Sequence, residues 1–161
     1  SLKHLHSLGS CKGLQLLDIR WCGQLDHLPN ISAFPALRAL NVEWCGKLTG
    51  LPGLEDAECL ERLVLRACNG IGTIPLSEAC KSLKEMTVAW FKGSTSILNV
   101  SSLPSLKELD LASCPDLEEL PDLSGFSFLA KLNLSGCTSL KKIAFSSEFQ
   151  HLSSLNLSGC G

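Results

Sequence analysis

The sequence lacks tyrosine altogether, has a single methionine among its 161 residues, and is only 6% aromatic. It also lacks an excess of charge, because 14 lysines and arginines face 16 aspartates and glutamates, for a net charge of −2. A protein without a cationic field has no general attraction for nucleic acid or anionic lipid, so we expect neither as a partner. No apolar run approaches the roughly 18 residues of a membrane-spanning helix, and the first residues do not follow the basic and then apolar pattern of a signal peptide. The composition therefore predicts a protein that does not enter a membrane.

The motifs of common enzyme and metal sites are missing as well. There is no glycine-rich phosphate loop, and no pair of cysteines has the close spacing of a zinc site. His4, His6, His27 and His151 fall on turns or on the back of the predicted fold, away from any serine or cysteine that could act as a nucleophile. We therefore predict that the protein is not an enzyme and binds no metal and no small-molecule cofactor.

What the sequence does contain is one pattern repeated every 23 residues. It begins with a column of leucines at Leu14, Leu37, Leu60, Leu83, Leu106, Leu129 and Leu152. Two more apolar columns follow three and five residues later, and the next column is Cys22, Cys45, Cys68, Phe91, Cys114, Cys137 and Cys160. Each period thus reads LxxLxLxxCxxLxxLP, and seven periods account for residues 1–161. We predict one repeat domain over residues 1–161, excised from a longer array and without caps.

The spacing within a period determines the expected fold. The alternating LxL segment predicts one short strand, and the remaining apolar residues turn inward, so each period closes a flat coil that buries its face only against a neighbour. Small residues and the LP pairs disfavour a long helix on the opposite side. The prediction is an α/β-type repeat solenoid that is curved, with a parallel sheet on the concave face, a mostly irregular or 3₁₀ convex side, and little α-helix.

The period resembles a leucine-rich repeat throughout the chain. The segment LKELDLASCPDLEELPDLSGF at 106–126, with cysteine at the ninth position and LxxLP after it, resembles the C-terminal repeats of plant nucleotide-binding leucine-rich-repeat immune receptors, the disease resistance proteins. That resemblance implies a protein-recognition region of plant defence and innate immunity, located in the cytoplasm or the nucleus. Its partner would be a pathogen effector, a host protein that the receptor guards, or the receptor's own switch domain.

Three alternatives to an immune receptor remain open at this point. The array could be the substrate-binding arm of an F-box ubiquitin-ligase adaptor, the ectodomain of a secreted receptor, or an engineered repeat scaffold, for which the equal periods would speak. Asn-x-Ser sequons, which favour secretion, begin at Asn30, Asn99, Asn133 and Asn156.

The nine cysteines are predicted to be structural. Those of the repeat column should be small buried residues at the corner where the strand turns, each thiol donating weakly to a local carbonyl, which suits a reducing compartment. The fourth period departs from this pattern, since Phe91 replaces the cysteine and Ser94 replaces an inward leucine. We expect residues 91–99 to bulge outward or to repack.

The residues between the inward columns predict the binding surface. All three tryptophans fall in one outward column, and all four arginines fall on strand positions of the first three periods. Tryptophan and arginine are the residues most enriched at binding hot spots. The predicted partner-binding residues are Trp21, Trp44, Trp90, Arg20, Arg38, Glu43, Arg62, Arg66 and Asp18. The alternative is that the tryptophans only shield the sheet edge, while Arg20, Glu43 and Arg66 neutralise one another across the strands.

Overall fold

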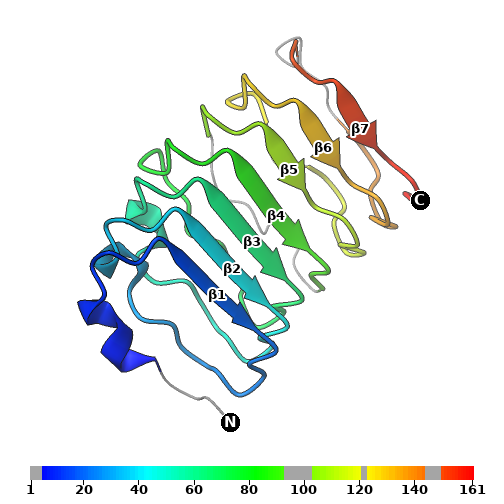
Figure 1. Cartoon of the computed structure of the whole chain (residues 1–161). Coiled ribbons are helices and arrows are strands. Elements are labelled where there is room, and N and C mark those ends of the chain that lie inside the picture. Colours follow the sequence, from blue (N-terminus) through cyan, green and yellow to red (C-terminus); the bar gives the residue numbers. More distant parts are fainter. Residues whose placement is uncertain (1–4, 93–102, 121–122, 144–149) are drawn as a thin grey trace.

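The computed structural model describes residues 5–92, 103–120, 123–143 and 150–161. In it the chain forms a solenoid with one seven-stranded parallel sheet, whose strands follow each other in chain order (Figure 1). The strands are β1 (Leu16–Arg20), β2 (Ala39–Glu43), β3 (Arg62–Arg66), β4 (Glu85–Ala89), β5 (Glu108–Asp110), β6 (Lys131–Asn133) and β7 (Ser154–Asn156). The predicted strand in each period is therefore confirmed.

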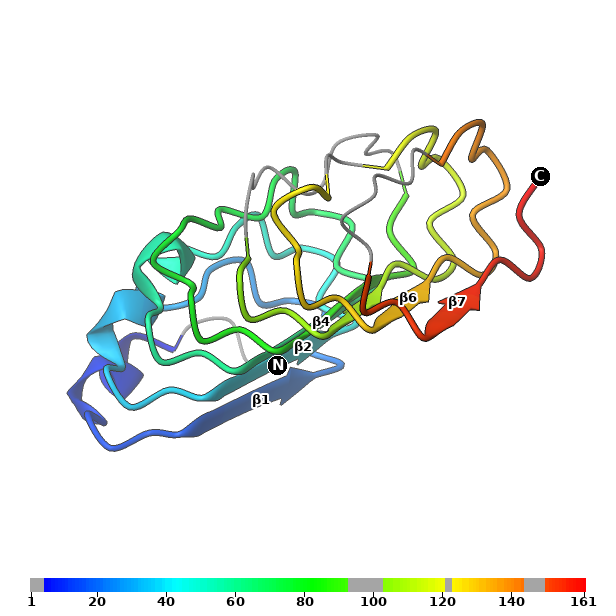
Figure 2. The same cartoon turned by 90° about the horizontal axis from the view of Figure 1, so that it is seen from above.

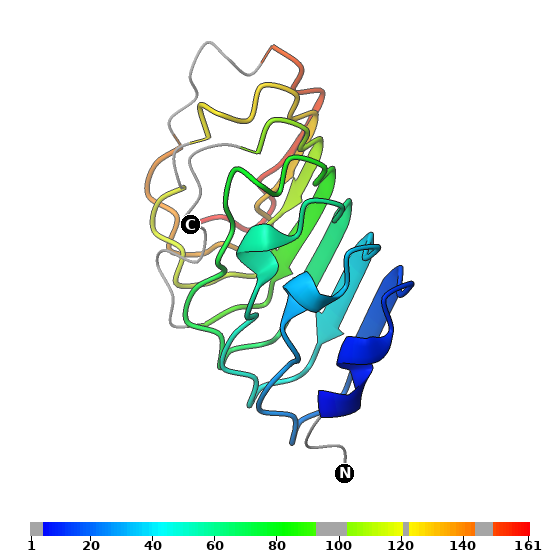
Figure 3. The same cartoon turned by 90° about the vertical axis from the view of Figure 1, so that its left-hand side faces the viewer.

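The pairing register repeats the period of the sequence. Leu17 pairs with Leu40, and Leu40 with Leu63, so each residue lies beside its equivalent 23 positions later. The sheet forms one side of the solenoid and irregular chain forms the other (Figure 2). The helices of the described residues are all 3₁₀: η1 (His6–Ser10), η2 (Ile31–Ala33) and η3 (Leu54–Asp56), which belong to successive coils (Figure 3). The prediction of little α-helix is confirmed.

The inward columns form one continuous apolar core. Leu40, Val42 and Leu63 are fully buried, and no polar or charged residue is buried among the described residues. Phe91 packs into this core at 2% exposure, in the place of a cysteine. Of the segment expected to bulge, residues 93–99 lie outside the described residues, and with them Ser94 and the sequon at Asn99.

The cysteine column lies where it was predicted. Cys45, Cys68, Cys114 and Cys137 are buried, whereas Cys22 and Cys160 of the outermost coils are half-buried. The thiol of Cys68 donates to the carbonyl of Val42 at 3.5 Å, and the other buried members make equivalent bonds to the preceding coil. The predicted weak donation to a local carbonyl is thus confirmed. Burial raises the pKa of the Cys114 thiol to about 11, because a thiolate is poorly solvated there.

The strands are not of equal length. Strands β1 to β4 have five residues each, whereas β5 to β7 have three. In β5 the carboxylate of Asp110 accepts the backbone N–H of Ala112 at 3.1 Å, and in β6 the side-chain oxygen of Asn133 accepts that of Ser135 at 3.1 Å. A side chain that binds the amide two residues ahead competes with strand pairing. These residues therefore end the later strands early.

Candidate functional site

The predicted tryptophan column occupies a special backbone position. One residue after β1 to β4, and three residues after β5 to β7, the chain passes through the left-handed region, with positive φ at Trp21, Trp44, Ala67, Trp90, Ser113, Gly136 and Gly159. The φ angles of the three tryptophans are 60°, 58° and 65°. Only glycine adopts this conformation freely, and a bulky side chain there costs about 1 kcal/mol. Five of the seven coils therefore hold a strained residue, a tryptophan in three of them, at a position where the last two coils have glycine.

The three indole rings form one cluster on the surface, which we call the tryptophan cluster. The rings of Trp21 and Trp44 are stacked with centroids 4.8 Å apart and an interplanar angle of 2°. That distance matches the usual spacing of paired strands, so neighbouring coils bring the rings together. Trp90 lies two coils beyond Trp44 and meets it edge-on at 5.5 Å. Ala67, the intervening member of the column, is only 8% exposed.

The tryptophan cluster combines ring-to-ring packing with solvent exposure. Trp21 is 72% exposed, Trp90 51% and Trp44 37%. The contacts between the rings support the alternative in which the tryptophans only shield the sheet edge. This applies chiefly to Trp44, which contacts both other rings. It does not account for Trp21, whose ring gains little burial and still requires a strained backbone.

Beside the tryptophan cluster lies a chain of alternating charges. Arg20 binds the carboxylate of Asp18 through two nitrogens at 2.7 and 2.9 Å. Arg20 also lies 3.6 Å from Glu43, and Glu43 lies 3.7 Å from Arg66. The hydrogen bonds that Arg20 donates to Asp18, followed by the negative charges of Asp18 and Glu43, raise the pKa of the Arg20 guanidinium. The expected self-neutralisation of this row is therefore present.

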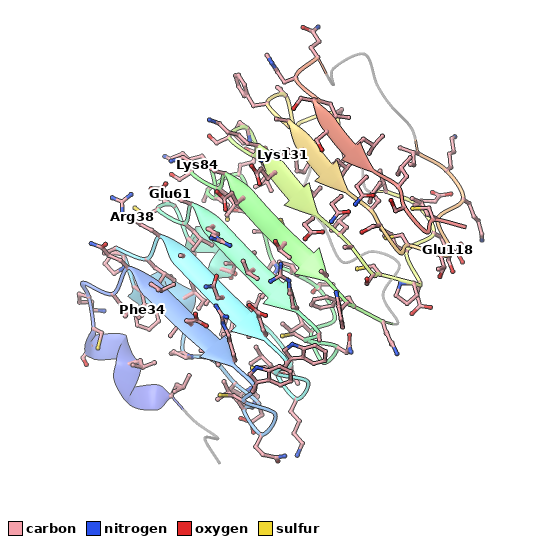
Figure 4. All side chains as sticks on the ribbon, turned by 45° about the vertical axis from the view of Figure 1, so that its right-hand side comes forward. Phe34, Arg38, Glu61, Lys84, Glu118 and Lys131 are labelled. Carbon is pink, nitrogen blue, oxygen red and sulfur yellow. The ribbon has the colours of Figure 1, made fainter. Side chains whose placement is uncertain are left out.

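The remaining predicted arginines lie at the starts of the strands. Arg38 binds the carboxylate of Glu61, which also accepts a hydrogen bond from Lys84 at 2.6 Å (Figure 4). These bonds, that of Lys84 first, lower the pKa of the Glu61 carboxyl. Arg62 lies 3.5 Å from Glu85. Arg38 and Arg62 thus belong to ion pairs at the starts of the strands, whereas the tryptophans follow the ends of the strands. Of the predicted charged residues, only Asp18, Arg20, Glu43 and Arg66 lie toward the tryptophan cluster.

A hollow of about 500 Å³ opens beside Trp44 and Trp90. We call it the tryptophan hollow, and it is lined by Trp44, Ala67, Asn69, Trp90, Lys92, Ser113, Pro115 and Gly136. Its width follows from the sequence of the strained column, because Ser113 and Gly136 leave space where an indole would otherwise stand. Cavities of a few hundred cubic ångströms accommodate small ligands or single side chains.

Two features of this site were not predicted from the sequence. The positive φ was signalled by Gly136 and Gly159, which share the repeat position of the tryptophans. Nothing in the sequence indicated that Lys92 would line the tryptophan hollow, because its position depends on how a turn packs. Val64 of β3 and Ala89 of β4 are only 2% and 1% exposed, so they add little to this surface.

The described residues contain no group of three or more histidine, cysteine, aspartate or glutamate side chains placed to hold a metal ion. No helix in the described part of the chain is long and apolar enough to cross a membrane. What the arrangement offers is a rigid surface of aromatic rings and paired charges, which is chemistry for binding.

Comparisons with known proteins agree with this fold. Residues 74–137 match the family model described as R13L1/DRL21 LRRs. The leucine-rich repeat domain of the type III effector XCV3220 (XopL) is a similar solved structure, with a TM-score of 0.70 and 23% identity. The match covers 98% of this chain and 65% of that one. A comparison with curated proteins found no match. The chain is a leucine-rich repeat array, a fold typical of protein-interaction modules.

Proposed function

We propose that this leucine-rich repeat array recognises a protein through the tryptophan cluster and serves as the ligand-sensing or autoinhibitory region of an intracellular plant immune receptor. The partner is then a pathogen effector, a host protein guarded by the receptor, or the receptor's switch domain, met in the cytoplasm or the nucleus. Residues 1–161 act as one domain in this proposal, within a longer array.

The proposed binding site rests on one observation: the three exposed tryptophans have a strained backbone with positive φ. Strained backbone that folding does not require is concentrated at functional sites, because selection retains it there. At the equivalent position Gly136 and Gly159 satisfy the same backbone without strain, so the coil itself does not need tryptophan. Exposed, clustered indoles also have the composition of binding hot spots.

The support for an immune receptor comes from the repeat itself. Residues 74–137 match a repeat model named for R13L1/DRL21, and the cysteine and LxxLP that recur in most periods resemble those of plant disease resistance proteins. The nine cysteines are all free thiols, an arrangement that suits a reducing compartment.

The experiment uses the full-length protein that carries this array, expressed in leaf tissue with and without candidate effectors. Trp21→Ala and Trp44→Ala are compared with Ser135→Ala, a matched change on the later coils. A ligand-sensing role predicts that both tryptophan variants lose the cell-death response. An autoinhibitory role predicts that both respond without an effector. Equal protein abundance on immunoblots is the control for folding.

The two tryptophan variants must agree, because they differ in structural cost. Among the described residues Trp44 contacts two rings and Trp21 one, so a purely structural effect would be clearly larger in Trp44→Ala than in Trp21→Ala. A wild-type response in both variants at normal abundance contradicts the proposal. Ser135→Ala should behave as the wild type.

A further inference from the structure

One charged side chain on the wall of the tryptophan hollow, that of Lys92, forms no ion pair within the described residues. Most cations of the sheet and its turns have a partner there, such as Lys84 with Glu61 at 2.6 Å and Lys131 with Glu108 at 2.6 Å. Lys92 is exposed on the wall of the hollow, and no ion pair of its ammonium occurs within the part of the chain that the structure describes. None of the described residues that line the hollow is acidic. An anionic group entering there would therefore meet an ammonium for which no described carboxylate competes.

The backbone of this lysine is held in place. Its N–H donates to the side-chain oxygen of Asn69 at 3.0 Å, one coil before it. The residues on both sides of the hollow are fixed by the sheet, since Trp90 N–H donates to Ala112 and Ser113 N–H to Ser135, at 2.9 and 2.7 Å. A site that is held before the ligand arrives loses little conformational entropy on binding.

The rest of the hollow is suited to an apolar group. Trp44 and Trp90 provide aromatic faces, and the neighbouring positions, Ala67 and Gly136, are small. A ring or branched side chain inserted beside the indoles would exclude water from two aromatic surfaces, which is the geometry in which hot spots gain most. The hollow thus combines the two indole rings of Trp44 and Trp90 with the ammonium group of Lys92.

We propose that the tryptophan hollow binds a single aromatic side chain of the partner with a carboxylate beside it, the ring against Trp44 and Trp90 and the carboxylate paired with Lys92. This proposal rests on the proposed function and specifies its partner: a protein segment in which an aromatic residue is flanked by aspartate or glutamate or is the C-terminal residue. The pairing is non-covalent, and the hollow selects an anionic ligand over a neutral one.

The test uses small probes that separate the two components. N-acetyl-phenylalanine carries both ring and carboxylate, its amide carries the ring alone, and N-acetyl-glycine carries the carboxylate alone. Titrations are followed by NMR through the indole N–H signals of the three tryptophans. We expect dissociation constants on the order of 1 mM for the first probe, since it is a fragment. The amide should bind about threefold more weakly, as for loss of one exposed ion pair. N-acetyl-glycine should not bind measurably.

Variants assign each component to its residue. Lys92→Met should keep the binding of N-acetyl-phenylalanine amide and abolish the preference for the acid. Lys107→Met removes an exposed lysine at the other end of a strand and should leave the preference intact. Trp90→Ala should weaken the acid and the amide alike by about fivefold or more, with thermal melts confirming that each variant is folded.

Several results would overturn the proposal. They are equal affinity for acid and amide in the unmodified protein, a preference that survives Lys92→Met, or no binding of either aromatic probe. These outcomes are independent of the leaf experiment. If the probes fail and Trp21→Ala still abolishes the response, the hollow is wrong and the proposed function stands. If the probes bind as expected and the tryptophan variants respond normally, the hollow is a binding site and the proposed function is wrong.

Discussion

The first four coils and the last three have the same core and different surfaces. Leu40 of β2 and Leu132 of β6 are equally buried, at 0% and 1% exposure. On the surface the first four coils carry every tryptophan and arginine and five-residue strands, while the last three carry serine, asparagine and glycine beside shorter strands. Both halves use the same left-handed turn after the strand. The difference shows that the coil requires only a residue that adopts positive φ at this turn, and that tryptophan there is a feature of the surface.

The largest expected effect tests whether the first four coils and the last three share the same core. Leu63→Ala in β3 and Leu132→Ala in β6 each leave a cavity in the shared core and should lower the free energy of unfolding by about 2–5 kcal/mol. Leu155→Ala is the control, because Leu155 in β7 is 39% exposed. Its cost should be well below that of the other two in urea denaturation. A large difference between Leu63→Ala and Leu132→Ala would show that the halves do not share one core.

The second prediction concerns the cysteine column, which is common to both halves. Cys114→Ser places a hydroxyl in a buried corner, but Val88 carbonyl, which accepts the thiol at 3.4 Å, remains available. The cost should be about 1–2 kcal/mol, toward the lower end for a buried hydroxyl. The exposed Cys59→Ser should change stability by less than about 0.5 kcal/mol. Equal costs for the two variants would contradict a structural role of the column.

Thiol reactivity gives an independent check of the same column. Because burial raises the pKa of the Cys114 thiol to about 11, little thiolate exists at pH 8, and reaction with a disulfide reagent should be slow. Cys11 and Cys59 are exposed and should react first. The check is made by mass spectrometry of the native protein over time, and early modification of Cys114 would contradict its placement.

The third prediction tests the strain at the left-handed turn. Gly136→Ala adds a methyl group at φ +75°, where it would also meet the Ser113 hydroxyl at 3.3 Å, and should cost about 1 kcal/mol. Ser113→Gly, at φ 57°, removes strain and should be neutral or up to about 1 kcal/mol more stable. The measurement is the denaturation midpoint of both variants. If Gly136→Ala is neutral, this turn does not penalise side chains and the argument from strain fails.

The sequence predicts the fold almost fully because every coil repeats the same spacing of apolar residues. Strand positions, register and the cysteine column all follow from the 23-residue period. It also places the tryptophans together, and the glycines at Gly136 and Gly159 could have revealed their strained backbone. The edge-on contact between Trp44 and Trp90 could not be predicted, because it depends on side-chain torsions above Ala67. The tryptophan hollow depends on that contact as well as on the small residues Ser113 and Gly136, and so it could not be predicted either.

The smallest expected effect concerns the ion pairs at the edge of the first coils. Hydrogen bonds from Lys84 and Arg38 lower the pKa of Glu61 in the folded protein. A carboxyl whose folded pKa is lowered contributes stability above its unfolded pKa and loses it as the pH falls through the folded value. Glu61→Gln should therefore melt slightly earlier than the unmodified protein at pH 7, and the difference should shrink progressively as the pH falls below the ordinary glutamate pKa of about 4.3. It should also shrink in high salt, and a difference that grows on acidification would contradict the assignment.

The central claim is that the tryptophans are held on the surface for binding and not for folding, and Trp21→Gly tests it most directly. Trp21 is 72% exposed, so loss of its small buried area and of one ring contact should cost roughly 1–2 kcal/mol, which relief of the strained backbone, worth about 1 kcal/mol, largely offsets. The free energy of unfolding, measured by urea denaturation, should stay within about 1 kcal/mol of the unmodified protein. A loss of more than about 2 kcal/mol would mean that Trp21 is needed for folding and would contradict the account.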